Sequence, residues 1–296
     1  YNADFDGDEM NFHITQNEEA RAEALILMLV QTQIISPRYG LSVVGCIHDA
    51  ITGNYLLTKE LVLTRNEAVD LLYNCGVEDF SSLPNKEKID GKEVFSVLLP
   101  RDFNFLGEDK AGNQVKIVNG VLKNGVMDKS NLGQESGLML RNVYEKYGPA
   151  FTADLLGKIS KLGIAVLTRR GFSIGVGDLE LLEETKTEIN NAIKKAEEEA
   201  MKLIDEFYAG KLQALPGRTV AETLELRILE ALNRARNKSG DIAIRQAKDS
   251  SALTMAKCGS RGNPLNIAQM TAIVGQQALR GKRIESGYKG RTLSYF

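Results

Sequence analysis

Three carboxylates near the start of the chain carry its strongest chemical signal. Asp4, Asp6 and Asp8 alternate within the pentapeptide Asp-Phe-Asp-Gly-Asp. In a straight strand the outer two would lie roughly 13 Å apart, too far for one ion, because Mg²⁺ takes oxygen ligands at about 2.0–2.1 Å. The segment must therefore curl, and Gly7 gives the backbone that freedom. Because clustered carboxylates repel one another without a cation, the pattern predicts a bound divalent metal, Mg²⁺.

Two other interpretations compete with a magnesium site. An EF-hand calcium loop would use the same three aspartates, but it needs glycine where Glu9 stands and glutamate where Thr15 stands. A plain acidic surface turn is the second alternative. Asn2 before the motif and Glu9-Met10-Asn11 after it favour the metal site over that turn.

The composition is that of a globular protein, and 296 residues suggest two domains. The 37 Lys and Arg against 39 Asp and Glu give a net charge of −2, and 43% of residues are hydrophobic. These values exclude a wholly disordered chain, a collagen-like fibre and a disulfide-stapled mini-protein. The longest apolar run, residues 24–30, is far shorter than the ~20 residues of a membrane span. Cys46, Cys75 and Cys258 lie far apart, which fits a reducing compartment and no zinc cage.

The first residues also bear on how the chain is used. The sequence begins at Tyr1 without Met and reaches the acidic motif at once. Chain ends are usually frayed, so a catalytic motif there would be poorly held. We therefore expect a segment of a longer polypeptide, with a processed N-terminus as the alternative.

Charge is unevenly distributed along the chain. From Lys257 onward seven basic residues face a single acid, Glu285, and glycines punctuate the stretch. Basic stretches suit phosphates, and glycine lets the backbone approach a ligand closely. Arg261, within Gly-Ser-Arg-Gly, can therefore reach a phosphate, or else serve as a cap or ion-pair partner. The acidic stretch 178–199 is interpreted as a solvated helix surface.

Periodicity and capping residues predict more helix than strand. Asn17 can cap a helix over 17–31 whose apolar face includes Leu25, Met28 and Leu29. Two strands joined by an Asn119-Gly120 turn form a small sheet. The other elements expected before residue 171 are helices over 48–57, 65–73 and 151–170 and the strands 114–118 and 121–126.

After the glycine-rich break at 171–177 only helices are expected. Asp178 would cap a long helix to about Tyr208, and a turn at Pro216-Gly217 would lead into a second. Thr219 and Glu222 form a capping-box pattern there, so the two helices make a long antiparallel hairpin. Ser239-Gly240 is expected to interrupt the second helix, with further helices ending near residues 258 and 277.

The first eleven residues, YNADFDGDEMN, resemble the absolute signature of the largest subunit of multisubunit DNA-directed RNA polymerases. The resemblance extends along the whole chain and is archaeal or eukaryotic in type rather than bacterial, with an archaeal subunit as first choice. Family-like segments are GFSIGVGD at 171–178, PGRT at 216–219, LNRAR at 232–236, GSRG at 259–262, NIAQM at 266–270, VGQQ at 274–277, GKRI at 281–284 and RTL at 291–293.

The resemblance implies a helix-rich α+β fold in three parts. Residues 1–46 would hold the metal-binding loop and the following helix, and 47–175 a mixed α/β pore-like region. Residues 176–296 would form an all-helical funnel-like region with the long hairpin, leading to a bridge helix that this sequence does not contain.

The resemblance also implies template-directed transfer of a nucleotide from an NTP to the RNA 3′ end. Asp4, Asp6 and Asp8 would be catalytic and hold one Mg²⁺, and a second Mg²⁺ would arrive with the NTP. Asn2 matches the position that reads the NTP ribose hydroxyl, and Arg261 a basic position near the triphosphate. His13 and His48 lie in no acid–base constellation and are interpreted as structural.

The implied partners are the second-largest and other polymerase subunits, DNA template, RNA transcript, NTP, and a transcript-cleavage factor at the funnel. No membrane is involved, and the location is the cytoplasm, or the nucleus in a eukaryote. The segment alone is expected to be inactive. One alternative is a non-catalytic helical interaction or scaffold module with an incidental acidic loop. Another is a self-sufficient metal nuclease or phosphatase, which would need a second carboxylate cluster near the first.

Overall fold

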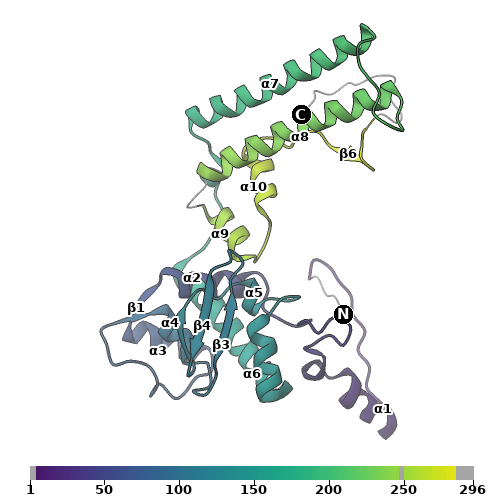
Figure 1. Cartoon of the computed structure of the whole chain (residues 1–296). Coiled ribbons are helices and arrows are strands. Elements are labelled where there is room, and N and C mark those ends of the chain that lie inside the picture. The colour runs from purple at the N-terminus through teal and green to yellow at the C-terminus, as the bar shows by residue number, and fades with distance from the viewer. Residues whose placement is uncertain (1–4, 247–249, 285–296) are drawn as a thin grey trace.

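A computed structural model describes residues 5–246 and 250–284 of the chain. Figure 1 shows an α/β body, a pair of long helices above it, and an N-terminal segment beside the body. The described structure is rich in helix and contains three small antiparallel sheets, so the expected α+β class is confirmed. No helix within the described ranges is long and apolar enough to cross a membrane.

The N-terminal helix is shorter and less regular than expected. Helix α1 (Glu18–Glu23) begins as predicted, because the Asn17 side chain accepts a hydrogen bond from the Ala20 N–H at 2.8 Å. A π-helical turn, η1 (Ala24–Met28), and a 3₁₀ turn, η2 (Val30–Gln33), follow in place of regular helix. The apolar side chains of residues 25–30 are exposed, so no core in the described structure holds this segment in one regular helix.

Two crossing helices organise the α/β body. Helix α2 (Asp49–Glu60) packs against α6 (Leu138–Arg170), and a Cβ atom on Gly53 would overlap the carbonyl of Gly163. Helix α6 starts well before the expected Phe151, and Gly148 (φ 82°) bends it just before Pro149. The remaining helices of the body are α3 (Arg65–Asn74), α4 (Gly91–Ser96) and α5 (Lys129–Leu132).

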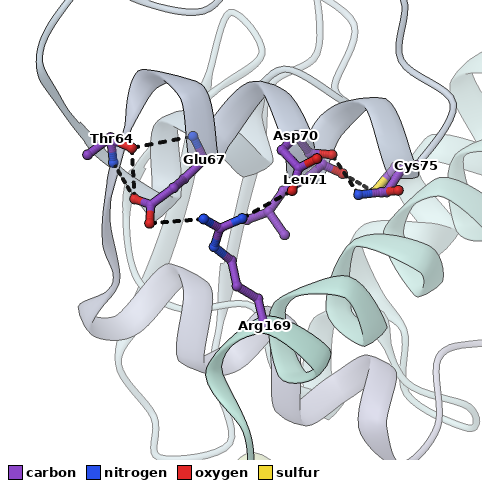
Figure 2. Close-up of polar contacts among 7 residues, drawn as sticks. Thr64, Glu67, Asp70, Leu71, Cys75 and Arg169 are labelled. Atoms are coloured by element: carbon purple, nitrogen blue, oxygen red, sulfur yellow. Dashed lines mark hydrogen bonds and ion pairs between the residues drawn. The ribbon is translucent and has the colours of Figure 1, made fainter.

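Polar contacts fasten the end of α6 to α3, as Figure 2 shows. The Arg169 guanidinium donates to Glu67 and to Asp70, both at 3.1 Å. Glu67 also completes a capping box with Thr64, and these hydrogen bonds from Thr64 lower the pKa of the Glu67 carboxyl. The Cys75 thiol donates to the Leu71 carbonyl at 3.0 Å.

The sheets of the described structure are all built from short antiparallel strands. In the three-stranded sheet, Asn119 (φ 50°) and Gly120 (φ 73°) form the expected tight turn between its last two strands. The strands are β1 (Val62–Thr64) paired with β2 (Lys88–Asp90), then β3 (Phe105–Glu108), β4 (Gln114–Val118) and β5 (Val121–Asn124) in that order, and β6 (Ala278–Leu279) paired with β7 (Lys282–Arg283). One large apolar core, including Phe95, Phe103 and Ile117, lies between strands β1 to β5 and the helices of the body.

A helical arm follows the body after the short turn η3 (Val176–Leu179). Helix α8 (Val220–Gln246) returns alongside α7 (Glu183–Tyr208), with alanines of α7 packed on Ile228 and Leu232 of α8 (Figure 1). The predicted capping box is present, because Thr219 and Glu222 each accept a hydrogen bond from the other's backbone N–H. Helices α9 (Ser251–Cys258) and α10 (Pro264–Thr271) connect the arm to the body.

Four details of the predicted arm are wrong. Helices are not its only elements, because strands β6 and β7 pair with each other there and β7 contacts α8. Asp178 does not cap α7, because its carboxylate accepts from the Gly175 N–H within the 3₁₀ turn, at 2.9 Å. Ser239-Gly240 does not interrupt α8, since both residues are buried and a Cβ on Gly240 would lie 2.9 Å from that of Ala268. The small residue makes room for α10 instead of breaking the helix. Helix α10 ends at Thr271, before the expected residue 277.

Candidate active site

The described part of the acidic motif contains an exposed turn at residues 5–7. Gly7 adopts φ 132°, a value that few other residues tolerate, and residues 5–7 turn. Asp6 and Asp8 are both exposed, and the neighbouring Phe5 side chain is 91% exposed. Two of the three predicted carboxylates thus lie at the surface of the described structure.

The rest of the predicted site lies outside the described residues, namely Asn2 and Asp4. Within the part of the chain that the structure describes, no group of three or more His, Cys, Asp or Glu side chains could hold a metal ion. The donor set nevertheless fits a hard cation, because the turn carries exposed carboxylate oxygens, the ligands that Mg²⁺ prefers. A complete three-carboxylate site would need Asp4 to join this turn.

Arg261 lies in a short loop between α9 and α10 whose backbone depends on glycine. Gly259 (φ 81°) and Gly262 (φ 71°) both adopt left-handed conformations. The N–H groups of Gly259 and Ser260 both donate to the Met255 carbonyl at 3.1 Å, which ends α9. The Asn263 side chain then accepts from the Asn266 N–H at 2.9 Å and starts α10.

The Arg261 side chain takes no part in these caps. It is exposed, and none of the hydrogen bonds or ion pairs identified among the described residues involves its guanidinium. Glycine and asparagine cap the two helices instead, and the buried ion pair of the basic region is formed by Arg283 with Glu225, at 2.8 and 2.9 Å. The cap and ion-pair alternatives for Arg261 therefore find no support among these contacts.

Side chains of the α/β body hold this loop in place. The Thr52 hydroxyl of α2 donates to the Ser260 hydroxyl at 2.8 Å. The Lys110 ammonium donates to the Ala256 carbonyl, also at 2.8 Å, near the end of α9. A Cβ on Gly259 would lie 2.8 Å from the Cβ of Lys129, so the loop backbone packs directly against α5. No sequence signal pairs these residues, because they are far apart along the chain.

Asp128 organises the part of the body on which the loop rests. Its carboxylate accepts from the Lys110 backbone N–H at 2.6 Å and from the Ser130 N–H at 3.0 Å, so it caps α5 and fixes the turn after β3. Burial raises the pKa of this carboxyl, and the hydrogen bond from Lys110 opposes that effect. Lys110 and Lys129 are thereby both directed toward the end of α9.

The remaining candidate groups have no visible chemical role. His13 and His48 are exposed, and His48 precedes α2 with an unusual φ of 47°. All three cysteines are free and buried, as expected for a chain without disulfides. Burial raises the pKa of the Cys46 thiol to about 11, so it is a poor nucleophile.

Comparisons with known proteins cover nearly the whole chain. Three models of the RNA polymerase Rpb1 family match in order: domain 2 over residues 1–30, domain 3 over 33–179 and domain 4 over 204–296. Together with the acidic turn and the helical arm, these matches define the class of protein. The chain belongs to the family of RNA polymerase largest subunits.

The relatives identify the part of that subunit. "DNA-directed RNA polymerase subunit Rpo1N" of Methanocaldococcus jannaschii is 41% identical over 316 residues, covering 100% of this chain and 24% of that subunit. The subunits of the same name from Thermococcus celer and Sulfolobus acidocaldarius are 39% and 40% identical, covering 100% of this chain and 37% and 36% of their own lengths. The predicted archaeal type is confirmed. The chain spans no more than 37% of these curated relatives.

Proposed function

We propose that this chain is a catalytic-core segment of a DNA-dependent RNA polymerase. In the complete enzyme it takes part in template-directed transfer of a nucleotide from an NTP to the RNA 3′ end. The observation that carries the proposal is the exposed acidic turn around Gly7, within the segment that matches the family's domain 2. A scaffold module alone would have no use for carboxylates gathered on such a turn.

The residues of the motif have distinct roles in this proposal. Asp4, Asp6 and Asp8 hold one Mg²⁺, and a second accompanies the NTP. When bound, such a pair of ions stabilises the attacking and leaving oxygens of an in-line displacement. The Asn2 amide, which both donates and accepts, binds the ribose hydroxyl of the NTP. The Arg261 guanidinium binds the triphosphate through charge-assisted hydrogen bonds.

We divide the chain into three parts within the proposed assembly. We assign residues 1–46 to the metal loop and following helix, 47–175 to the pore-like region and 176–296 to the funnel-like region before the bridge helix. The antiparallel pair α7 and α8 forms the rim of the channel that admits NTPs and receives a transcript-cleavage factor. The second-largest and other subunits, the DNA template and the RNA complete the site in the cytoplasm of an archaeal cell.

Asp6→Ala in a polymerase reconstituted with the full-length subunit tests this function. We expect assembly to be unchanged and nucleotide addition to be abolished. Metal occupancy is read independently by replacing Mg²⁺ with Fe²⁺ and mapping local hydroxyl-radical cleavage, which the variant should lose. Glu9→Gln is the matched control, since it removes a neighbouring exposed carboxylate outside the triad. An active Asp6→Ala enzyme would leave the scaffold module as the better interpretation.

A further inference from the structure

The position of the Arg261 guanidinium depends on the backbone that carries it. No hydrogen bond or ion pair identified within the described ranges involves the guanidinium. The residues on either side, Ser260 and Gly262, differ in how they are held. A Cβ atom added to Gly262 would have the Asn266 side-chain oxygen as its near neighbour, at 3.9 Å, so little packs against this glycine. Ser260, by contrast, is held through its side-chain hydroxyl. Ser260 is therefore the fixed point next to Arg261.

The anchor of Ser260 comes from a buried residue of helix α2. Thr52 is 1% exposed, and its hydroxyl lies 2.8 Å from the Ser260 hydroxyl but 3.3 Å from the His48 carbonyl. A hydroxyl has one proton, so the shorter contact is the better hydrogen bond. Thr52 precedes Gly53, where α2 meets α6, and β-branched side chains have few rotamers in a helix. The donor can therefore move little relative to the core.

The other contacts of this region act earlier in the chain. Lys110 holds the Ala256 carbonyl, and Lys129 packs against Gly259. Both fix the end of α9, but neither reaches past the flexible φ of Gly259. Beyond that glycine, the Ser260 N–H and hydroxyl donate to the Met255 carbonyl at 3.1 and 3.4 Å, which ties Ser260 to α9. The Thr52–Ser260 hydrogen bond at 2.8 Å ties the same residue to α2 of the body.

We propose that Thr52 and Ser260 are positioning residues for Arg261, through the hydrogen bond that joins α2 to the loop. The inference rests on the proposed contact between Arg261 and the NTP triphosphate. Loss of this bond lets the loop rotate about Gly259 and Gly262, so the guanidinium spends less time within reach of phosphate. The acidic motif, which belongs to a different segment, is unaffected.

Thr52→Val in the reconstituted enzyme keeps the shape of the side chain and removes its donor. We expect the KM for NTP to rise about 2- to 12-fold, the loss that one intramolecular hydrogen bond causes, with kcat nearly unchanged. Thr52→Ser should restore most of the affinity. Thr152→Val is the matched control, because it removes another buried threonine hydroxyl that bonds only within α6, to the Gly148 carbonyl at 2.8 Å.

Ser260→Ala removes the acceptor of the same hydrogen bond. This variant provides the test if the Thr52→Val enzyme fails to assemble. It should raise KM to the same extent, and the double variant should be no worse than either single one. In an Arg261→Ala background Thr52→Val and Ser260→Ala should cause no further rise.

Equal rises with and without Arg261, or a rise in Thr152→Val as large as in Thr52→Val, would refute the positioning role. If Arg261→Ala alone leaves KM unchanged, the phosphate contact fails and this inference fails with it, while the metal role remains judged by Asp6→Ala.

Discussion

At the residue scale, exposure and burial separate side chains that can act on a ligand from those that cannot. Arg261 is exposed in a loop where Met255 and Asn263 provide the helix caps, and its guanidinium has no ion-pair partner identified among the described residues. Cys46 is the opposite case, with its sulfur buried 3.5 Å from the Ser160 hydroxyl. Arg261 is therefore tested through the use of NTP, and Cys46 through the dependence of stability on pH.

Replacing Arg261 should weaken the use of NTP by the assembled enzyme. Arg261→Ala loses a charge-assisted hydrogen bond of about 1.5–3 kcal/mol, which is roughly a 10- to 150-fold fall in kcat/KM. Arg261→Lys should recover part of the loss, because a point charge still attracts phosphate. Steady-state kinetics with varied NTP measures both. Lys238→Ala, which removes an exposed positive charge from α8, is the control and should change little.

The pKa of Cys46 predicts how stability depends on alkaline pH. Burial raises that pKa to about 11 from a usual value near 9, so the thiolate forms more readily in the unfolded chain. The contribution of Cys46 is complete below about pH 9 and is lost as pH rises toward about 11. Urea unfolding of the purified chain at pH 8 and 10.5 should show a fall in the free energy of unfolding that is larger than in Cys46→Ala, by up to roughly 2 kcal/mol. Burial raises the pKa of Cys75 as well, so the variant retains a fall of its own. Parallel losses in both proteins would contradict the assignment.

At the element scale, the crossing of α2 and α6 governs the body. Gly53 and Gly163 each stand where a Cβ would overlap the backbone of the other helix. The Asn54 amide donates to the Ile159 carbonyl at 2.9 Å, which adds a buried polar link across the same crossing. The packing of α2 against α6 therefore requires the two backbones to approach closely.

Adding one methyl group at this crossing should be costly. Gly53→Ala should lower the free energy of unfolding by about 2–3 kcal/mol, since the methyl group must push two packed helices apart. Gly157→Ala is the matched control, because Gly157 is exposed in α6 with no atom near its Cβ direction, and alanine favours helix there by about 0.5–1 kcal/mol. Chemical denaturation gives the free energy of unfolding of the unsubstituted chain and of the two variants. Equal values for the unsubstituted chain and Gly53→Ala would show that the crossing tolerates a side chain.

What the sequence could predict at this scale was local. The Asn17 cap, the Asn119-Gly120 turn and the Thr219–Glu222 box each depend on residues within a few positions, and all are present. Ser239-Gly240 was misread because its purpose, room for Ala268, lies on another helix. The short strands β1, β2 and β3 were not foreseen, since three or four residues carry too little periodicity.

The residues of the candidate site also differ in whether the sequence could predict them. The acidic motif and the glycines around Arg261 are sequence signals, and both correspond to exposed or strained backbone in the structure. The anchors Thr52 and Lys110 are ordinary residues until folding brings them to the loop. Sequence reasoning therefore found the groups proposed to act but not those that hold them.

At the scale of the whole molecule, the body and the arm are built differently. The body contains one large apolar core, whereas the apolar residues of the arm form small separate clusters. Helix α7 packs mainly on α8 and buries few residues, among them Ile189 and Ala200 (Figure 1). The arm is therefore held together by smaller apolar clusters than the body.

Hydrogen exchange should reveal this difference. Backbone amides of α7 in the purified chain should exchange at least roughly tenfold faster than those in the middle of α2, because opening the arm exposes less apolar surface than opening the body. Exchange monitored by mass spectrometry resolves the two helices. Equal protection would mean that arm and body unfold together.

The purified 296-residue chain should not synthesise RNA on a primed template. The proposed Asp4, Asp6 and Asp8 site would hold one metal ion, but positioning of template, primer and NTP needs surfaces that the proposal assigns to the rest of the enzyme. Incorporation of labelled nucleotide, with the reconstituted polymerase as positive control, measures this. Activity of the chain alone, lost in Asp6→Ala, would overturn the expectation.

The glycine pair at the crossing of α2 and α6 also constrains how such chains diverge. Alanine is one nucleotide change from glycine, yet a change at either Gly53 or Gly163 meets the backbone of the opposite helix. We therefore expect the two glycines to be kept together during evolution. A side chain at either position requires the two helices to move apart. A relative with a side chain at one position should thus carry compensating changes along the whole α2–α6 contact.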